Sequence, residues 1–453
     1  MTAAEILVDG ALAVEWAGLD AAVQQAARTF FHDTLCVGVA GRNAPNADRV
    51  FELAGQWGGS GPCRVLGRPG ASLSAPYAAF ANAFQIHAQE YDCVHEGAVA
   101  HPLATVLAAL LAEVDRSGPY DGEAFLAALV AGVDVVAALG LAPTSPLKFF
   151  RPATAGIFGS VAAVARLRRL DRETALDAFG GALAYASGTM QAHIEGKPTL
   201  ALQVAGAARS AIEAIDLAVA GLPGARGSID GPFGYFALFE DASLPIRALE
   251  PGHHRITELS WKPFPTGRAA HGAIVAMQAM RREGLTAEGL DRFTYRAPPL
   301  IARLVGRRPI EGMTAPYARL CFAYLGAVTL LRGTVGLEDF DDAALADRDV
   351  LALAERIHVE VDANEDPAAF VPAIAIAVQG ERHFEQRVTR QLGSPEWPLT
   401  RAQHLAKASS CLQFGGLPDA EPSLAALFDS AHAVVDIGHA VGAAFGVRNS
   451  DRK

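Results

Sequence analysis

The chain has 453 residues and 51% of them are hydrophobic, so we expect about two to three packed units instead of one small core. Its formal net charge of -11, from 38 lysines and arginines against 49 acidic residues, argues against a nucleic-acid-binding protein, which normally has a basic face. The five cysteines are scattered without a Cys-x-x-Cys pair, the N-terminus lacks the basic segment of a signal peptide, and apolar runs such as 125–141 are short for a bilayer span. The sequence therefore predicts a cytoplasmic protein with no nucleic-acid and no membrane partner.

The first half of the chain predicts one helix after another. Asp20 is a suitable N-cap for a helix over 21–39. Pro76 suits the first turn of a helix over 76–91, where its missing N–H is not needed. In five more segments apolar residues recur at three- and four-residue spacing, and alanine and glycine allow close helix contacts. These segments are 103–114, 123–139, 156–170, 172–187 and 203–220.

The pattern changes in the second half. The rigid segment 261–267 leads into a helix over 271–282, and four strand-like segments follow, with a turn at Gln379–Gly380. The strand-like segments are 292–296, 358–361, 373–378 and 383–390. Helices return over 401–412 and 424–441. We therefore predict a mainly α fold with an α+β part: an all-α domain from 1–262 and 401–453, and an inserted α+β domain over 263–400.

The densest group of titratable residues follows the second predicted helix. It consists of Glu90, Asp92, His95, Glu96 and His101. Acids and imidazoles at the end of a buried helix are costly unless they are paired, exposed or used in chemistry. His101 is a candidate general base, since the proline after it favours an extended backbone. Asp92 and Glu90 are candidates to orient an imidazole or to bind substrate.

Each candidate also has a plain structural explanation. A lone histidine such as His101 is more often a helix cap, and Asp92 is nearly as often a surface acid. Lys262 lies among aromatic residues and prolines, where its stem covers an aromatic patch or its ammonium serves proton transfer or carboxylate binding. Arg151 and Arg268 are possible carboxylate clamps, although each is individually more typical of a surface salt bridge. Tyr324 is a proton donor to a leaving group or a core tyrosine with a satisfied hydroxyl.

A metal site and a nucleotide site are both disfavoured by the sequence. The acids and histidines over 90–101 have metal-ligand chemistry, but their spacing matches no His-Glu-x-x-His pattern, so we predict no metal. Gly196-Lys197-Pro198 lacks the Ser/Thr and the upstream glycine of a P-loop, and no Gly-x-Gly-x-x-Gly follows a predicted strand.

Four landmarks in chain order resemble the MmgE/PrpD family, which includes 2-methylcitrate dehydratase, cis-aconitate decarboxylase and iminodisuccinate epimerase. Ala81–Pro102 contains Ala-Asn-x-x-x-x-His, then Tyr-Asp, then His-Pro. Thr154–Gly159 opens an alanine-rich helix, Trp261–His271 begins Trp-Lys-Pro-Phe-Pro, and Tyr317–Tyr324 contains Ala-Arg-Leu-Cys. The resemblance implies an all-α domain with an inserted α+β domain, a homodimer, an active-site cleft between the domains, and chemistry without a cofactor on small di- and tricarboxylates.

The resemblance also assigns candidate residues. The positions that match the family pattern are Asp92, His101, Lys262, His271 and Tyr324. Of these we assign His101, Asp92, Lys262 and Tyr324 to catalysis and His271 to substrate binding. The sequence departs from the family at Phe150, Leu200 and Gln203, which stand where the family has histidine, lysine and histidine. Lys197, with Glu195 and His193, lies just upstream as a possible replacement. The other candidate substrate-binding residues are Glu90, Arg268, Arg151, Phe150, Lys197 and Gln203.

Three functions remain open at this point. The first is a dehydratase-like lyase that removes a proton beside a carboxylate of a small di- or tricarboxylate and eliminates a leaving group. The second is an epimerase or isomerase on the same scaffold, with two bases on opposite faces of one carbon. The third is a carboxylate-binding protein without catalysis, suggested by the altered positions 150, 200 and 203.

Overall fold

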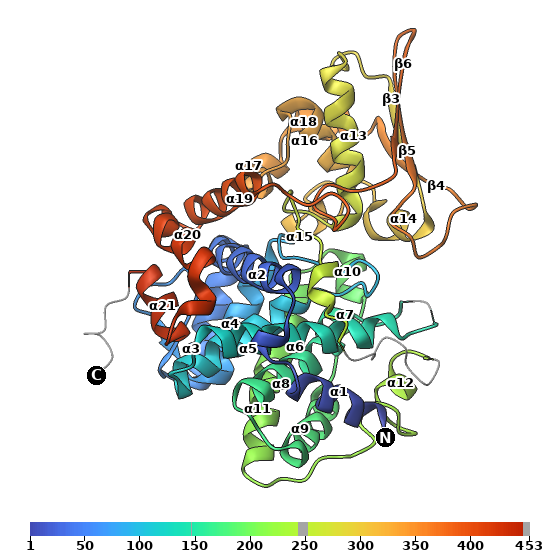
Figure 1. Cartoon of the computed structure of the whole chain (residues 1–453). Helices are drawn as coiled ribbons and strands as arrows, with labels where there is room; N and C mark the ends of the chain where they lie inside the picture. The colour runs from blue at the N-terminus through green and yellow to red at the C-terminus, as the bar shows by residue number, and fades with distance from the viewer. Residues whose placement is uncertain (146, 243–251, 447–453) are drawn as a thin grey trace.

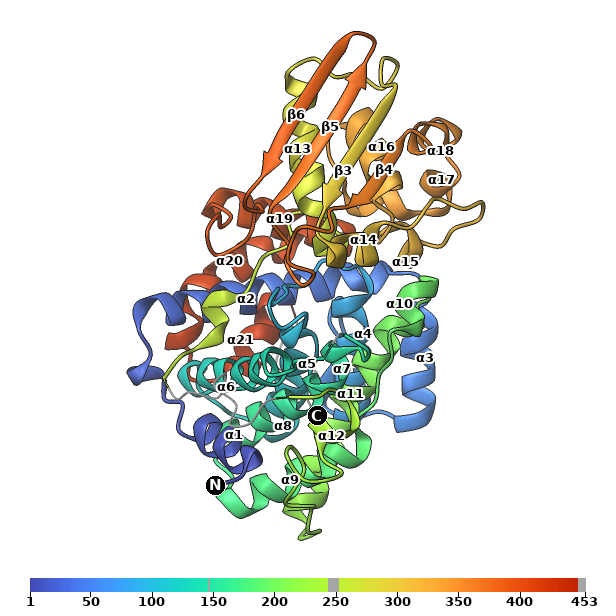
Figure 2. The same ribbon diagram turned by 90° about the vertical axis from the view of Figure 1, so that its right-hand side faces the viewer.

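The computed structural model describes residues 1–145, 147–242 and 252–446, and it has two hydrophobic cores. The larger core joins the first part of the chain, up to Leu259, with helices between Ala408 and Ala444 near the other end, and it also takes in Leu337. We call this part the helical bundle. The smaller core lies between Phe264 and Val388, and we call it the α+β unit. Figures 1 and 2 show the α+β unit standing on one side of the helical bundle. The prediction of a mainly α fold with an α+β part is confirmed, and the two cores support the domain boundaries that we propose at 262/263 and 400/401.

The helical bundle is built from helices that mostly begin and end where the sequence predicts. Its longer helices are α1 (Ala3–Leu12), α2 (Ala21–Ala40), α3 (Ala47–Gly58), α4 (Ala75–Ala88), α5 (Pro102–Ser117), α6 (Gly122–Leu141), α8 (Gly156–Leu167), α9 (Arg172–Tyr185), α11 (Thr199–Val219), α19 (Arg401–Phe414), α20 (Glu421–Ser430) and α21 (Ile437–Ala444). Short helices α7 (Arg151–Thr154), α10 (Gln191–Glu195) and α12 (Tyr235–Leu238) and a small hairpin of β1 (Cys63–Arg64) and β2 (Ser72–Leu73) complete it. As predicted, Asp20 caps α2 by accepting a hydrogen bond from the backbone N–H of Val23 at 2.8 Å.

Close packing in the bundle depends on small residues. Helix α6 packs against α8, and α4 packs against both α5 and α11. At the α6–α8 contact, a Cβ added to Gly132 would lie 2.8 Å from the carbonyl oxygen of Gly159, and one added to Gly159 would lie 2.6 Å from that of Gly132. Neither position therefore accepts a side chain without moving a helix.

Helix α6 is long and apolar enough to cross a membrane by length and composition alone. However, 83% of its apolar window is buried among other parts of the protein. The one acid in its middle, Asp134, accepts hydrogen bonds from His254 and from the backbone N–H of Arg255, both at 2.7 Å. These features fit the core helix that the sequence predicts.

The α+β unit contains a four-stranded sheet in the order β4-β3-β5-β6. Its strands are β3 (Arg292–Ala297), β4 (Ile357–Val361), β5 (Ala373–Gln379) and β6 (Arg382–Val388), with β3 parallel to β4 and antiparallel to β5. The predicted turn joins β5 to β6, and Gly380 there has a φ of 58°. Helices α13 (His271–Arg282) and α16 (Phe322–Arg332) pack on the sheet (Figure 2), accompanied by α14 (Pro299–Val305), α15 (Ala315–Ala318), α17 (Asp342–Leu345) and α18 (Arg348–Ala354).

Two predicted helices differ from the structure for identifiable reasons. The helix predicted over 76–91 ends at Ala88, because Glu90 has a φ of 50° in the left-handed region, which cannot continue an α-helix. The helix predicted over 424–441 is two helices, α20 and α21. Between them the chain detours to hydrogen-bond the loop before α6: Val434 accepts from the backbone N–H of Gly122, and Ile437 donates to Tyr120.

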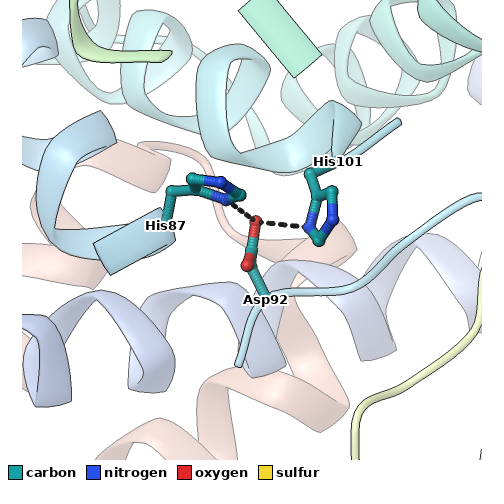
Figure 3. Close-up of side chains that lie close together, drawn as sticks. All are labelled: His87, Asp92 and His101. Carbon is teal, nitrogen blue, oxygen red and sulfur yellow. Dashed lines mark hydrogen bonds and ion pairs between the residues drawn. The ribbon is translucent and has the colours of Figure 1, made fainter. Parts of the chain in front are cut away.

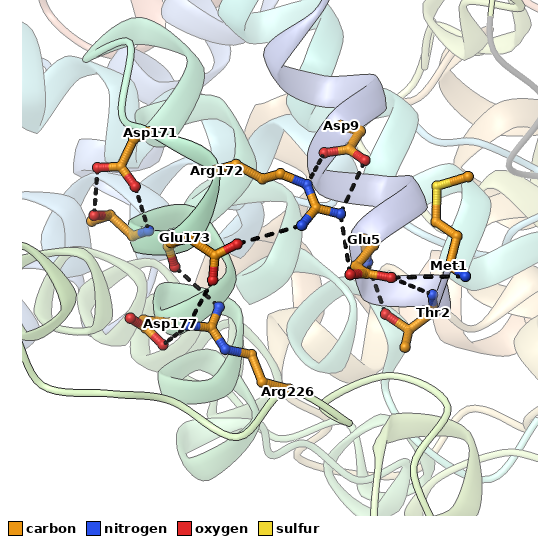
Figure 4. Close-up of polar contacts among 10 residues, drawn as sticks. Met1, Thr2, Glu5, Asp9, Asp171, Arg172, Glu173, Asp177 and Arg226 are labelled. Carbon is orange, nitrogen blue, oxygen red and sulfur yellow. Dashed lines mark hydrogen bonds and ion pairs between the residues drawn. The ribbon is translucent and has the colours of Figure 1, made fainter.

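An ionic network fastens the first helix to the bundle surface (Figure 4). Arg172 at the start of α9 contacts Asp9 at 2.7 Å and Glu5 at 3.2 Å, both on α1. Arg226 makes a similar link from its loop to Asp177 on α9, at 2.9 Å. Because these side chains remain partly exposed to solvent, the network positions α1 more than it stabilises the fold.

Arg319 ties the α+β unit to the bundle. Its Nη1 donates to the backbone oxygens of Gln89, at 3.0 Å, and Pro265, at 2.7 Å, and its Nη2 donates to the Gln89 side chain.

We predict that Arg319→Met lowers the free energy of unfolding by about 3 kcal/mol, because buried acceptors lose their donor. Arg292→Met is the control, since its ion pair with Glu360 is exposed and should contribute less than about 1 kcal/mol. Urea unfolding of both variants measures the difference, and equal losses would contradict this role for Arg319.

Candidate active site

A cluster of two histidines and one aspartate lies where α4 ends and α5 begins. His87 is in the last turn of α4, Asp92 is in the loop that follows, and His101 directly precedes α5. The Nδ1 atoms of His87 and His101 both lie 3.1 Å from Oδ2 of Asp92 (Figure 3). An ionised carboxylate only accepts hydrogen bonds, so each Nδ1 carries a proton and donates it. This arrangement leaves Nε2 of His101 as the nitrogen available for proton transfer.

The surroundings divide the two imidazoles into an acid and a base. Burial alone would lower the pKa of His87, but the Asp92 and Glu90 carboxylates outweigh burial and raise that pKa above 6.5. For His101, burial dominates, the Lys262 ammonium adds to it, and the pKa falls below 6.5 despite Asp92. The two neighbouring imidazoles keep the pKa of Asp92 well below its usual range, although burial opposes them. Near pH 6.5 the cluster therefore holds a charged His87, a neutral His101 and an ionised Asp92.

Glu90 forms a buried ion pair with Lys262 beside this cluster. Nζ of Lys262 donates to Oε2 of Glu90 at 2.8 Å and to its backbone oxygen at 3.1 Å. Burial would raise the pKa of Glu90, but the Lys262 ammonium and the nearby imidazoles lower it to about 2. The left-handed backbone of Glu90 lets one residue offer both oxygens to the same ammonium. A non-glycine residue in this region is a local strain of the kind found at functional sites.

A cavity of about 60 Å³ lies between the helical bundle and the α+β unit next to these pairs. Bundle residues line one side and residues of the α+β unit, among them Leu304, Leu320 and Phe370, line the other. Of the predicted site residues, five line it: Glu90, His101, Phe150, Arg151 and Arg268. Asp92 and Lys262 do not line the cavity themselves. Asp92 is hydrogen-bonded to His101, and the ammonium of Lys262 is hydrogen-bonded to Glu90, and both of these partners line it.

Arg268 enters the cavity wall from the α+β unit. Its Nε donates to Oε1 of Glu96 at 2.7 Å, and its Nη1 donates to the backbone oxygen of Leu392 at 2.6 Å and to Nδ1 of His271 at 3.2 Å. Burial lowers the pKa of His271 far below 6.5, and the charge of Arg268 acts in the same direction, so His271 is neutral and accepts this hydrogen bond. His271, predicted to bind substrate, is fully buried and lies outside the cavity lining, where it orients Arg268.

Phe150 and Arg151 stand at the start of the short helix α7. The Phe150 ring lines the cavity and lies 5.6 Å, between ring centroids, from the imidazole of His87. The Arg151 guanidinium is turned away: Nε donates to both oxygens of Glu240, at 2.8 and 3.0 Å, and Nη1 donates to two backbone carbonyls. Phe150 is therefore a wall of the cavity, and Arg151 is a salt-bridged support behind it.

Three other predicted residues lie away from the cavity lining. The Tyr324 hydroxyl donates to the backbone oxygens of Asp339, at 2.6 Å, and Ala344, at 3.2 Å, inside the α+β unit. Gln203 exchanges two hydrogen bonds with the backbone of Thr189. Lys197 is exposed, and it lines a smaller hollow with His87 and Glu90 on the far side of the cluster. A catalytic role for Tyr324 and substrate contacts for Gln203 and Lys197 stay predictions.

Sequence reasoning did not assign His87 to the site. The signal was present, because His87 is the histidine of the Ala-Asn-x-x-x-x-His pattern and is one helical turn before the acidic loop. His193, considered only as a possible replacement, also lines the cavity. Burial, together with the charge of Arg307, lowers the pKa of His193 to about 4, so it presents a neutral imidazole.

The His87, Asp92 and His101 cluster also has ligand atoms for a metal, since one such atom of each residue lies within 4.8 Å of the others. Hydrogen bonds from both Nδ1 atoms to one carboxylate oxygen already account for this geometry. The arrangement therefore does not call for a cation.

Comparison with known proteins decides the family. The model of the MmgE/PrpD N-terminal domain matches residues 5–245, and that of the MmgE/PrpD C-terminal domain matches residues 264–424. The chain belongs to the MmgE/PrpD family. The family predicted from the four sequence landmarks is thus confirmed.

Three curated relatives are similar to this chain over most of their own length. The human protein named cis-aconitate decarboxylase is 27% identical over 371 residues, which cover 77% of this chain and 74% of the relative. The mouse protein of the same name is 25% identical over 391 residues, covering 82% and 78%. A cis-aconitate decarboxylase-like protein of Aspergillus oryzae is 27% identical over 366 residues, covering 75% of each.

The opposite pKa shifts of the two imidazoles give a direct prediction for this MmgE/PrpD protein. The His87 signal should titrate above pH 6.5, since neighbouring carboxylates stabilise its charged form, and the His101 signal should titrate below pH 6.5, since burial favours its neutral form. NMR of histidine-labelled protein from pH 4 to 9 measures both, with His87→Gln and His101→Gln to assign the signals. Titration of both imidazoles on the same side of 6.5 would contradict the division into acid and base.

Proposed function

We propose that this protein is a lyase that acts on the carbon next to a carboxylate of a small organic acid. The observation that carries this proposal is the hydrogen bond from Nδ1 of His101 to Asp92, which leaves a neutral Nε2 at the cavity. The arginine of the cavity wall, Arg268, supplies a cation for a substrate carboxylate. The relatives named as cis-aconitate decarboxylases support a carboxylate substrate and a lyase reaction.

The proposed step is a proton transfer with elimination. Nε2 of His101 takes a proton from the carbon beside the carboxylate, and the electron pair of that C–H bond forms a carbon–carbon double bond. The bond to a leaving hydroxyl on the adjacent carbon breaks, and the leaving oxygen takes the proton back from Nε2 of the His101 imidazolium and departs as water. Asp92 stabilises the imidazolium that forms on His101 in this step. A positioned acid or base of this kind typically contributes about 10²- to 10⁴-fold in rate.

Decarboxylation uses the same groups in a different order. The bond to a carboxyl carbon breaks, carbon dioxide leaves, and the electron pair stays on the remaining carbon. A protonated imidazole then returns a proton to that carbon. The cluster holds the charged His87 beside the neutral His101, so both protonation states of an imidazole are present near the cavity.

Hydrogen–deuterium exchange tests the lyase proposal whichever product the reaction forms. In deuterated buffer, a panel of small mono-, di- and tricarboxylates that includes cis-aconitate is followed by proton NMR. We predict that His101→Gln slows exchange or elimination of the reactive acid by at least about 100-fold, since the base is lost. The control is His383→Gln, an exposed histidine of β6. Turnover by His101→Gln at the wild-type rate would overturn the assignment.

A second candidate, an epimerase, is favoured by one observation. His101 and His193 both line the cavity, and the pKa of each is lowered, which keeps both imidazoles neutral. Proton removal on one face and return on the other requires one imidazole in its neutral form and the other in its protonated form, so one of the two would carry a proton when the substrate arrives.

Deuterium incorporation without net elimination distinguishes the epimerase from the lyase. We predict that His193→Gln leaves elimination of the reactive acid within about threefold of wild type if the enzyme is a lyase. A loss of about 100-fold, equal to that of His101→Gln, would instead assign a two-base epimerase. Binding of carboxylates with no chemistry in the whole panel would leave the third alternative, a non-catalytic binding protein. The homodimer and the cytoplasmic location expected from the sequence remain proposals.

A further inference from the structure

The charges around the cavity are already balanced within the part of the chain that the structure describes. Arg151 is paired with Glu240 at 2.8 Å, Lys262 with Glu90 at 2.8 Å, and Arg268 with Glu96 at 2.7 Å. The charged His87 and the ionised Asp92 form a fourth pair at 3.1 Å. A substrate with two or three carboxylates would therefore bring more charges into a buried site than the two arginines of its described lining, both already paired, can match.

Among the arginines that line the cavity, one donor nitrogen is the exception. Nη2 of Arg268 is buried and has no hydrogen-bond partner among residues 1–145, 147–242 and 252–446, whereas Nε and Nη1 of the same guanidinium are engaged. The Arg268 side chain is only 3% exposed, and the residue lines the cavity. An unpaired buried N–H group is costly, and a ligand oxygen that reached this nitrogen would remove that cost. Arg307 also has a buried nitrogen without a partner, Nη1, but its Nη2 donates to the backbone oxygen of His193 at 2.8 Å and Arg307 does not line the cavity.

Apart from Glu90, His101, Arg151 and His193, most of the remaining wall is apolar. Phe149, Phe150 and Met190 line the bundle side, and Leu304, Leu320 and Phe370 line the side of the α+β unit. The Phe149 ring is fixed by a 5.0 Å edge contact with Phe239, and Phe150 packs on His87. These side chains offer no hydrogen bond to a carboxylate, but they fit an alkyl or aryl group.

Glu90 would repel a second carboxylate on the substrate. Glu90 lines the cavity and its carboxylate is ionised, with Oε2 accepting a hydrogen bond from Lys262. A second substrate carboxylate placed beside it would meet a like charge in a poorly solvated site, which is how a binding site rejects a competing ligand.

We propose that the substrate is a small acid with a single carboxylate, bound by Nη2 of Arg268, and with an alkyl or aryl arm that packs against Phe150. This inference rests on the proposed lyase function and names its substrate class. It separates this protein from an enzyme for cis-aconitate, which carries three carboxylates. In the proposed substrate, an apolar arm occupies the part of the cavity where cis-aconitate would place its second and third carboxylates.

Binding of three probes to the full-length protein tests this substrate class. We predict by isothermal titration calorimetry that trans-2-hexenoate, a monocarboxylate with an alkyl arm, binds at least tenfold more tightly than cis-aconitate. The matched neutral probe trans-2-hexenamide keeps the arm but lacks the charge, and it should bind at least tenfold more weakly than the acid. Cis-aconitate that binds as tightly as hexenoate, or more tightly, would overturn the inference.

Two variants test the two proposed contacts separately: the carboxylate with Arg268, and the apolar arm with Phe150. Arg268→Gln should weaken hexenoate at least tenfold and leave the amide unchanged, since only the acid uses the charge. Phe150→His should weaken hexenoate and improve cis-aconitate, so that the ratio of their dissociation constants shifts at least tenfold; this second variant keeps the Arg268–Glu96 pair intact. An unchanged ratio in Phe150→His, or equal losses for acid and amide in Arg268→Gln, would contradict the proposed contacts.

The outcomes for substrate class and for reaction are separable. If His101-dependent exchange occurs with a tricarboxylate and hexenoate binds poorly, the lyase stands and the substrate class fails. If hexenoate binds as predicted and no acid in the panel reacts, the substrate class of the cavity stands and the lyase fails.

Discussion

The carboxylate of Asp92 is the constraint on which the rest of the site depends. It is fully buried, and one of its oxygens receives hydrogen bonds from two imidazoles. A buried carboxylate without such partners would be strongly destabilising, so the cluster is held together by the need to pair this charge. The bond to His101 fixes the proton of its neutral imidazole on Nδ1, and it leaves Nε2 of His101 free to accept a proton.

The local fold follows from placing this carboxylate between two helices. Helix α4 has to stop before Asp92, and the left-handed Glu90 stops it; helix α5 has to start after His101, and Pro102 starts it. Lys262, on the segment that leads into the α+β unit, then pairs with Glu90. The joint between the bundle and the α+β unit is thus also the place where the charges of the site are balanced.

Much of this could be predicted from the sequence, because local patterns determine it. Helix periodicity and caps located most of the bundle, and alternation with a turn located β5 and β6. Asp92 and His101 are nine residues apart and belong to one motif, so their proximity was foreseeable. The pairing of Lys262 with Glu90 joins residues 172 positions apart, and local patterns do not contain it. For the same reason the sequence did not show that Arg151 points to Glu240 or that Tyr324 bonds inside the α+β unit.

The protonation of His101 tests the central claim most directly. Nitrogen NMR of histidine-labelled protein near pH 7 distinguishes the two nitrogens of a neutral imidazole. The account predicts a proton on Nδ1 and none on Nε2 of His101 in the wild type, and loss of this single tautomer in Asp92→Asn. A proton on Nε2 in the wild type, with Nδ1 free, would contradict the account, since His101 then could not be held by Asp92 as a base.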